Sequence, residues 1–202
     1  MPNSNPFLAA IVLAGGKSRR MGTDKALLKL GDETLLQRTC HIAAAVCEAV
    51  SVVTPWGDRY RSELSPTITL IPEPTVPGEQ SAGPLMGFLH ALPQQQAEWI
   101  LLLACDLPRL QQSVLERWRQ DLATLPDTAL AYVPHVSQGW EPLCGFYRRD
   151  CLESLEAFVE GGDRSFQKWL EILPAQPIPV TGDDVLFNCN TPEDWESVQK
   201  TR

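Results

Sequence analysis

The sequence predicts an α/β fold in which helices cover both faces of a mostly parallel central sheet. Short apolar runs alternate with segments of helical periodicity through the first two thirds of the chain, as in sheets built from strand–helix–strand units. Two of these runs, Phe7–Leu13 and Trp99–Leu103, are almost continuously apolar, which is typical of strands buried on both faces. We therefore expect a Rossmann-like three-layer sandwich.

The first elements follow one another in a regular order. Phe7–Leu13 is the first strand, and apolar residues at helical spacing predict a helix over Thr34–Val46. A second strand is expected at Ala49–Thr54 and a short helix at Asp58–Leu64. The apolar run Thr69–Ile71 predicts a third strand.

The middle of the chain continues the alternation after a proline-rich stretch, 72–77, that excludes regular structure. Pro84 is tolerated at a helix start, which predicts a helix over Pro84–Leu92. Trp99–Leu103 follows as a strand. A helix over Gln111–Leu122 and a strand over Ala129–Val133 complete this part.

After about residue 134 the alternation is weaker. We expect a strand at Leu143–Tyr147, helices at Cys151–Val159 and Ser165–Leu170, and a short strand near Leu186. No repeat or linker interrupts the chain, and 202 residues suffice to bury one core. The sequence therefore predicts a single domain over residues 1–202, with 1–6 as a flexible tail.

Composition excludes several classes of function. Asp and Glu outnumber Lys and Arg by 25 to 17, giving a net charge of −8, and nucleic-acid binding needs a broad basic face instead. No apolar stretch is long enough to cross a membrane, and the polar N-terminus does not resemble a signal peptide. The six cysteines and three histidines are dispersed, which argues against a disulfide framework or metal cluster. We expect a cytoplasmic protein.

In a largely parallel sheet, ligands bind at the carboxyl ends of the strands. Here these ends are the loop Leu13–Lys25, the loop after Ile71, and Asp106. Each of them carries charged residues, and the first is also rich in glycine. We therefore expect the functional site at this edge of the sheet.

The loop Leu13–Lys25 holds three glycines and four cations. Such cations on a surface are usually only solvated, but glycines let a phosphate approach backbone N–H groups, and Arg and Lys neutralise its charge. The loop is not a P-loop, because Ile11 stands where that motif requires glycine. The dinucleotide fingerprint GxGxxG is also absent. The loop therefore predicts a triphosphate site of another kind.

Asp106 follows the most apolar run of the chain directly. A carboxylate at the end of a buried strand is costly unless it is paired or binds a metal. Mg²⁺ prefers one or two carboxylates together with phosphate oxygens, so we expect Asp106 to bind Mg²⁺. The alternative is that Asp106 caps the helix after Pro108.

The first loop resembles the LAGGxSxRMGxDK signature of the nucleotidyltransferase superfamily, and within it the family of molybdenum cofactor guanylyltransferases (MobA-like nucleotidyltransferases). The matching residues are Leu13-Ala14-Gly15-Gly16, Ser18, Arg20-Met21-Gly22 and Asp24-Lys25. Three further segments resemble family motifs. They are GPLxG at Gly83–Gly87, PCDxP at Ala104–Pro108 with alanine in place of the first proline, and NxNTP at Asn188–Pro192.

The resemblance runs from about residue 8 to residue 198. It implies a fold of the nucleotide-diphospho-sugar transferase type and Mg²⁺-dependent transfer of GMP from GTP to molybdopterin or molybdenum cofactor, with release of pyrophosphate. The catalytic residues would be Arg20, Lys25 and Asp106. Asp106 would bind the metal, and the two cations would offset charge on the leaving pyrophosphate. Relatives that transfer CMP tend to have alanine at Gly15, so this glycine favours guanine.

The same resemblance implies the nucleotide pocket. Its residues would be Leu13, Ala14, Gly15, Gly16, Lys25, Thr54, Glu73, Gly83, Gly87 and Asp106. Relatives often carry Asn and Asp at the positions of Thr54 and Glu73, so these two are departures that keep hydrogen-bonding groups. Alternatively, Pro84 only begins a helix and Gly87 only packs closely.

The resemblance also places the nucleotide in the N-terminal half and the acceptor against residues after about 134. The acceptor-side candidates are Trp140, Arg164, Asn188 and Asn190. Each has a structural alternative. Trp140 could be a core or edge residue, Asp163 beside Arg164 could cap the next helix, and Asn190 could cap a helix that begins near Pro192.

Two rival functions remain open. One is transfer of an NTP to another phosphorylated acceptor, such as CMP transfer to molybdenum cofactor or transfer to a sugar phosphate. The other is a non-catalytic nucleotide-binding adaptor in cofactor delivery, against which the intact Asp106 and Arg20 argue. In either case the partners would be small molecules, with transient contacts to molybdenum-insertion proteins or target molybdoenzymes. No nucleic acid or membrane is expected.

Overall fold

Strand β1 (Leu8–Leu13) lies inside the sheet because its side chains are apolar on both faces. The computed structural model describes residues 7–15, 24–74, 82–180 and 183–200. β1 pairs in parallel with β4 (Ala49–Thr54) on one side and β6 (Trp99–Ala104) on the other. Leu13 is level with Val53 and Ala104. The loops after these three strands therefore meet at one edge of the sheet.

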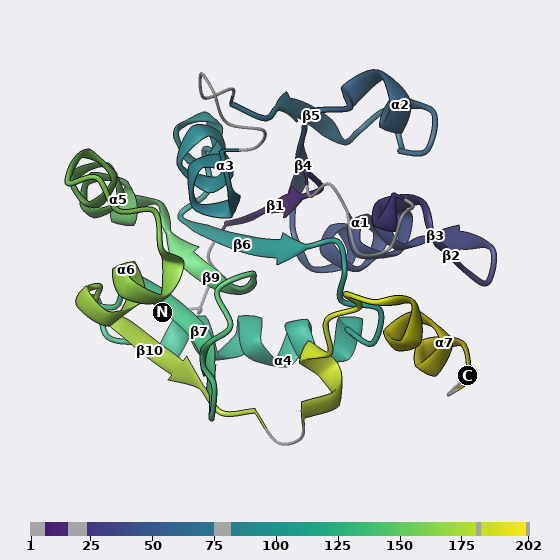
Figure 1. Cartoon of the computed structure of the whole chain (residues 1–202). Coiled ribbons are helices and arrows are strands. Elements are labelled where there is room, and N and C mark those ends of the chain that lie inside the picture. The colour runs from purple at the N-terminus through teal and green to yellow at the C-terminus, as the bar shows by residue number, and fades with distance from the viewer. Residues whose placement is uncertain (1–6, 16–23, 75–81, 181–182, 201–202) are drawn as a thin grey trace.

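The remaining strands extend the sheet in the order β10-β7-β9-β6-β1-β4-β5 (Figure 1). β5 (Thr69–Pro72) is parallel to β4, and β10 (Ala175–Ile178) is parallel to β7 (Ala131–Val136). β9 (Cys144–Arg148) runs antiparallel to both β6 and β7. The short β8 (Gly139–Trp140) pairs with β7. The parallel half of the sheet thus carries the edge described above.

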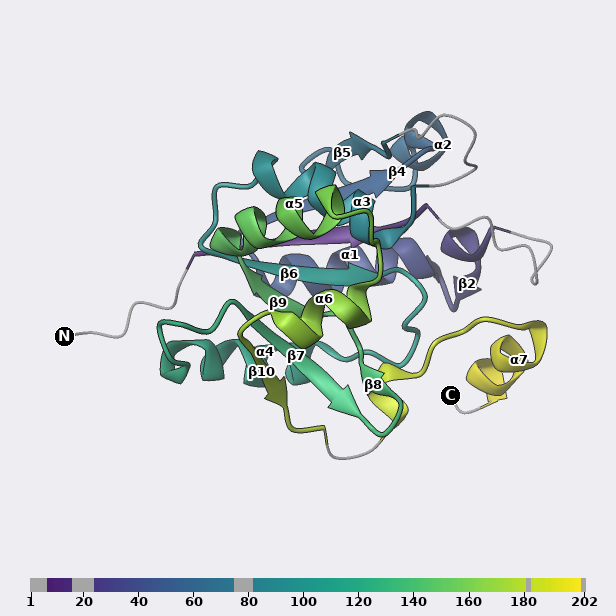
Figure 2. The same ribbon diagram turned by 60° about the vertical axis from the view of Figure 1, so that its left-hand side comes forward.

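Helices cover both faces of the sheet, which confirms the predicted α/β class. α1 (Leu35–Val46) and α4 (Gln112–Asp121) pack on one face. α3 (Pro84–Ala91), α5 (Leu152–Glu160) and α6 (Phe166–Ile172) pack on the other. Figure 2 shows the second group in front of the sheet and the first group behind it.

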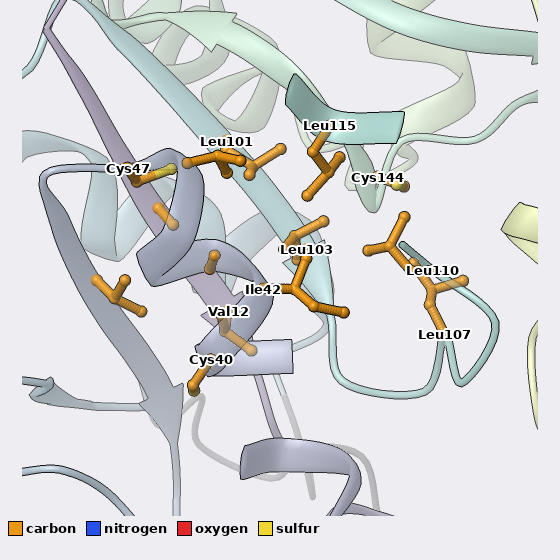
Figure 3. Close-up of a cluster of buried hydrophobic side chains, with 14 of the residues drawn as sticks. Val12, Cys40, Ile42, Cys47, Leu101, Leu103, Leu107, Leu110, Leu115 and Cys144 are labelled. Carbon is orange, nitrogen blue, oxygen red and sulfur yellow. The ribbon is translucent and has the colours of Figure 1, made fainter. Parts of the chain in front are cut away.

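The alternation of side chains along β1 divides the core into two apolar clusters. Leu8, Ala10 and Val12 face α1 and α4, whereas Ala9 and Ile11 face α3, α5 and α6. Figure 3 shows part of the first cluster, to which cysteines contribute as apolar side chains. All six cysteines are free thiols. Side chains from both clusters therefore pack against β1, the strand that ends at the predicted site.

Several shorter elements complete the fold. They are the hairpin of β2 (Lys29–Leu30) and β3 (Glu33–Thr34), the helices α2 (Gly57–Arg61) and α7 (Pro192–Lys200), and the 3₁₀ helices η1 (Lys25–Leu27), η2 (Leu92–Gln94), η3 (Leu122–Thr124), η4 (Arg149–Cys151) and η5 (Asp183–Leu186). In the described parts of the chain, no helix has the length and apolar character needed to span a membrane.

Two sequence expectations were wrong, and one strand was not predicted. The strand expected near Leu186 is η5, and Leu186 is buried because that turn packs on the first core cluster. Pro72 was expected outside regular structure but ends β5, and Pro177 lies within β10, which was not predicted. Both strands are at the edges of the sheet, where a missing N–H breaks no ladder.

Candidate functional site

A pocket of about 400 Å³ opens at the carboxyl ends of β1, β4 and β6. Its walls come from all parts of the chain: Leu13, Ala14, Gly15, Asp24, Lys25, Ala26, Val53, Tyr60, Glu73, Gly83, Pro84, Gly87, Ala104, Cys105, Asp106, Leu143, Asn188 and Asn190. The pocket thus lies at the predicted edge, and it collects most of the predicted nucleotide-binding residues that the structure describes. Gly16 and Arg20 lie outside the described residues.

Gly15 lines the pocket where β1 has just ended. The strand ladder continues to Ala14, whose N–H donates to the carbonyl of Val53 at 2.9 Å. A Cβ added at Gly15 would lie 2.3 Å from Oε2 of Glu73, far inside a normal contact. A side chain at this position would therefore displace the end of the Glu73 side chain.

Lys25 reaches across the pocket from the first turn of η1. Its Nζ donates to Oδ1 of Asn190 at 2.8 Å and lies 3.7 Å from Oδ2 of Asp106. Only 15% of the Lys25 side chain is exposed. The amine therefore brings a positive charge to a point shared by the end of β6 and the segment before α7.

Asp106 follows β6, and 23% of its side chain is exposed. Burial raises the pKa of this carboxyl, and the positive charge of Lys25 acts in the opposite direction. Its Oδ1 is buried and has no hydrogen-bond partner among the described residues. α4 begins only at Gln112, and Gln111 precedes it without a side-chain cap. The alternative that Asp106 caps this helix is therefore wrong.

No group of three or more His, Cys, Asp or Glu residues in the described parts of the chain could hold a metal by itself. Asp106 is a single, partly buried carboxylate whose Oδ1 is buried and has no hydrogen-bond partner among the described residues. A cation bound there would have to complete its shell with amide, water or ligand oxygens.

The segment before α7 docks on the end of β6 (Figure 1). The Cys189 N–H donates to the carbonyl of Asp106 at 3.0 Å, and Asn188 and Asn190 on either side line the pocket. Asp194 Oδ2 accepts the N–H groups of Asn190 and Thr191, each at 2.8 Å. These N–H groups lower the pKa of Asp194.

Thr191 Oγ1 accepts the N–H of Asp194 at 3.2 Å, so Thr191 caps α7 in a reciprocal pair with Asp194. The alternative that the Asn190 side chain caps this helix is therefore wrong. Its Oδ1 instead accepts the hydrogen bond from Lys25.

Gly83 and Gly87 line the pocket at the start of α3. Gly83 has φ +84°, a conformation that side chains other than glycine rarely adopt. Pro84 follows as the first helical residue. A Cβ at Gly87 would meet Leu13 and Val53 at ordinary distances of 3.5 and 3.7 Å. Gly83 therefore provides a positive φ before α3, whereas Gly87 lines the pocket and packs against Leu13 and Val53.

Thr54 does not line the pocket, unlike its neighbour Val53. It is buried, and its hydroxyl accepts the N–H of Trp56 at 3.1 Å. Glu73 does line the pocket, and its own N–H donates to the Thr54 carbonyl at 3.0 Å. The structure thus places Glu73 in the site and leaves Thr54 behind it.

Two of the four acceptor-side candidates lie away from the pocket. The Trp140 and His135 rings pack edge to face with their centres 4.6 Å apart, and Trp140 Nε1 donates to Glu171 at 3.2 Å. Arg164 is not among the lining residues. The neighbouring Asp163 accepts the N–H of Ser165, and Ser165 is the residue that caps α6. The alternative that Asp163 caps this helix is therefore wrong. The structure therefore brings Asn188 and Asn190 to the site but not Trp140 and Arg164.

Several pocket residues were not singled out from the sequence, among them Tyr60, Cys105 and Leu143. Cys105 was visible only as part of the PCDxP match. Tyr60 lies in the short helix α2 and belongs to no motif. Its hydroxyl donates to Asp24, 36 residues earlier in the chain. No local pattern could have indicated that contact.

The MobA-like NTP transferase domain family matches residues 10–177 of this chain. The probable molybdenum cofactor guanylyltransferase of Trichormus variabilis is 50% identical over 192 residues, which are 95% of this chain and 90% of that relative. The corresponding protein of Synechococcus elongatus is 50% identical over 191 residues, or 95% and 97% of the two chains.

Among solved structures, molybdopterin-guanine dinucleotide biosynthesis protein A of Archaeoglobus fulgidus has the same fold. Its TM-score is 0.75 at 22% identity, covering 96% of this chain and 97% of the other. The family match spans most of this chain and includes the loop after β1, β6 and Asp106. The chain therefore belongs to the MobA-like NTP transferase domain family.

Proposed function

We propose that this nucleotidyltransferase transfers GMP from GTP to molybdopterin or molybdenum cofactor and forms the guanine dinucleotide form of the cofactor. The names of the relatives at 50% identity support the substrates. The observation that carries the proposal is the buried, unpartnered Oδ1 of Asp106 beside the Lys25 amine, in a pocket at the strand ends.

The donor set at this end of the pocket fits Mg²⁺. A buried carboxylate oxygen without a partner is costly, and Asp106 Oδ1 is such an atom. Asn188 and Asn190 add amide oxygens to the same wall. These are the oxygen ligands that Mg²⁺ accepts together with phosphates and water. Bound there, Mg²⁺ would supply positive charge against the triphosphate.

The reaction needs no side-chain nucleophile, because the terminal phosphate of the acceptor is already anionic. One of its oxygens forms a bond to the α-phosphorus of GTP, the bond from that phosphorus to the β-phosphate oxygen breaks, and pyrophosphate leaves with the electron pair. In our proposal Lys25 and Arg20 offset the charge on the leaving group. Their task is to align the groups and neutralise charge.

Glu73 supports the choice of guanine. The edge of guanine presents the donors N1–H and N2–H₂ side by side, and a carboxylate is an acceptor with two oxygens. Cytosine presents a donor beside an acceptor on its pairing edge, which suits a carboxylate less well. Glu73 lies against Gly15 in the pocket, so Gly15 gives space to the group that would read the base.

The variant Asp106→Asn tests the metal assignment. We expect Mg²⁺-dependent pyrophosphate release from GTP and purified cofactor to fall by roughly a hundredfold or more. Asp121→Asn is the matched control, because this carboxylate accepts from Tyr132 outside the pocket. Full turnover in Asp106→Asn would contradict the proposal. A larger thermal shift with CTP or UTP than with GTP would favour the rival reading as another NTP transferase.

The proposal includes a division of labour within one domain, with nucleotide bound by the N-terminal half and the acceptor against residues after about 134. Leu143, Asn188 and Asn190 are pocket residues from the second part. We also propose that the reaction is cytoplasmic and that product passes to molybdenum-insertion proteins or molybdoenzymes through transient contacts. Cross-linking in cells followed by identification of captured proteins tests this, and capture of none of these proteins would contradict it.

A further inference from the structure

Tyr60 projects from α2 into the wall of the pocket, and its side chain is fully buried. Its hydroxyl donates to both carboxylate oxygens of Asp24, at 2.9 Å to Oδ1 and 2.8 Å to Oδ2. A buried hydroxyl costs free energy unless it is paired, and phenylalanine would fill the same space without that cost. In this structure the Asp24 carboxylate is the partner that offsets this cost.

Asp24 receives hydrogen bonds from two further donors. Its Oδ1 accepts the N–H of Ala26 at 3.2 Å, which caps η1, and its Oδ2 accepts from Nη1 of Arg59 at 2.9 Å. The Arg59 guanidinium lies 5.5 Å from the ring centre of Trp56. One carboxylate thus connects the start of η1 to α2, the helix that follows β4.

The residue held most directly by this arrangement is Lys25. It follows Asp24 in the chain and begins η1, and its Nζ reaches Asn190 and Asp106 on the far side of the pocket. A lysine side chain has four flexible carbons, and holding its amine in one place restricts many rotamers. Its amine can be placed reproducibly only if the backbone from which it starts is fixed.

We propose that Tyr60 is a positioning residue for Lys25 and acts through the carboxylate of Asp24. The proposal rests on the proposed function in one respect, since it takes Lys25 to bind the triphosphate. Burial and the Asp24 carboxylate raise the pKa of Tyr60 above its usual value, so the phenol remains a hydrogen-bond donor at neutral pH. Tyr60 itself does not touch the reacting atoms.

The variant Tyr60→Phe removes the hydroxyl and keeps the ring. We expect the affinity for GTP, measured by calorimetry with Mg²⁺, to fall about tenfold, as loss of a hydrogen bond to a charged group predicts. Asp24→Asn removes the charge of the shared acceptor and replaces one oxygen by a donor, so it should lower GTP affinity at least as much. Tyr132→Phe is the matched control, because the buried Tyr132 hydroxyl donates to Asp121 at 3.0 Å outside the pocket. It should lower the melting temperature similarly and leave GTP affinity unchanged.

A double-mutant cycle with Lys25→Ala separates positioning from direct contact. If Tyr60 acts through Lys25, Tyr60→Phe should change GTP affinity less than twofold when Lys25 is already alanine. Additive losses, or an unchanged affinity in Tyr60→Phe alone, would overturn the inference. If Lys25→Ala had unchanged GTP affinity and unchanged pyrophosphate release, the role of Lys25 in the proposed function would be refuted. That failure is seen in the Lys25 variant, so it is distinguishable from a failure of the Tyr60 inference.

Discussion

At the scale of single residues, the pocket is defined by close approaches. Gly15 and Glu73 are 58 positions apart by residue number, yet their atoms leave no space for a methyl group between them. Asp106 and Lys25 approach each other in a similar way from β6 and η1. The chemistry of the site therefore depends on which side chain each backbone position admits.

Gly15→Ala should change base preference more than stability. The added Cβ would overlap the end of the Glu73 side chain, which can rotate away, so we expect the free energy of unfolding to change by less than about 1 kcal/mol. Displacing the carboxylate should weaken GTP binding by roughly tenfold and bring the GTP and CTP affinities closer together. Calorimetric titration with both nucleotides measures this.

Gly57→Ala is the control for this change, because nothing lies within 4 Å of an added Cβ there. It should leave both nucleotide affinities unchanged. If Gly15→Ala bound GTP as tightly as the parent protein, Glu73 would not be the group that reads the base.

At the scale of elements, the segment from η5 to α7 completes the pocket from the C-terminal end of the chain. Arg109, three residues after Asp106, forms an ion pair with Asp184 at 2.7 Å, and its guanidinium lies 4.4 Å from the ring centre of Phe187. Asn188 follows directly. The loop after β6 thus contains both Asp106 and Arg109, and Arg109 contacts the segment that precedes Asn188.

Arg109→Met should loosen this segment while keeping most of the apolar stem. We expect faster hydrogen exchange at residues 184–190, a loss of about 1 kcal/mol in the free energy of unfolding, and a KM for GTP raised about threefold. Arg148→Met is the matched control. Arg148 pairs with Glu98 at 2.6 Å and lies 4.7 Å from the Trp99 ring centre, at the opposite end of β6. It should lose similar stability, and an equal rise in KM there would contradict the assignment to Arg109.

At the scale of the whole molecule, polar contacts connect the layers on the side of the sheet away from the pocket. Glu48, between α1 and β4, accepts the N–H of Leu8 at 2.8 Å and a hydrogen bond from Arg119 of α4 at 2.7 Å. Burial raises the pKa of Glu48, but the Leu8 N–H and Arg119 outweigh it, so the net effect is a lowered pKa. One ionised carboxyl therefore joins the sheet to the helix layer formed by α1 and α4.

The variant Glu48→Gln should remove a stabilisation that depends on pH. Because the folded-state pKa is lowered, the stabilisation is fully present above the ordinary glutamate value and disappears as pH falls through the lower folded-state pKa. The side chain is 42% exposed, so solvent screening limits the effect to less than about 1 kcal/mol. Urea unfolding of both proteins at neutral and strongly acidic pH should show a difference that vanishes in acid.

Glu116→Gln is the control for this experiment. In the described part of the chain, Glu116 accepts a hydrogen bond from Gln112, one helical turn away, and from no other residue. Its difference from the parent protein should be small at both pH values. A Glu48→Gln difference that persisted in acid would assign the effect to packing and not to ionisation.

Much of the fold was predictable because its signals are local. The apolar runs of β1 and β6 and the proline at the start of α3 predicted elements that the structure contains, with ends shifted by a few residues. The errors have a common cause. β10 contains a proline and the turn at Leu186 is apolar, and in both places the neighbouring elements overrode the local preference.

The site was predictable in part. Lys25, Asp106 and Asn190 were identified before their contacts were known, and the structure brings them together. The roles proposed for them remain predictions, as do those of Gly16 and Arg20 outside the described residues. Trp140 and Arg164 lie away from the pocket, because motif resemblance gives positions in the chain and not distances in space.

The sequence by itself determined the fold class, the edge of the sheet where the site lies, and the charged groups that meet there. These follow from buried apolar strands and from the common edge that parallel strands share. Only the tertiary structure decided that Tyr60 holds Asp24 and that Glu73 lies against Gly15. It also decided that Asn190 faces Lys25 while Thr191 caps α7. The long-range contacts join residues 36 to 165 positions apart, and hydrogen bonds over such separations leave no periodic pattern in the chain.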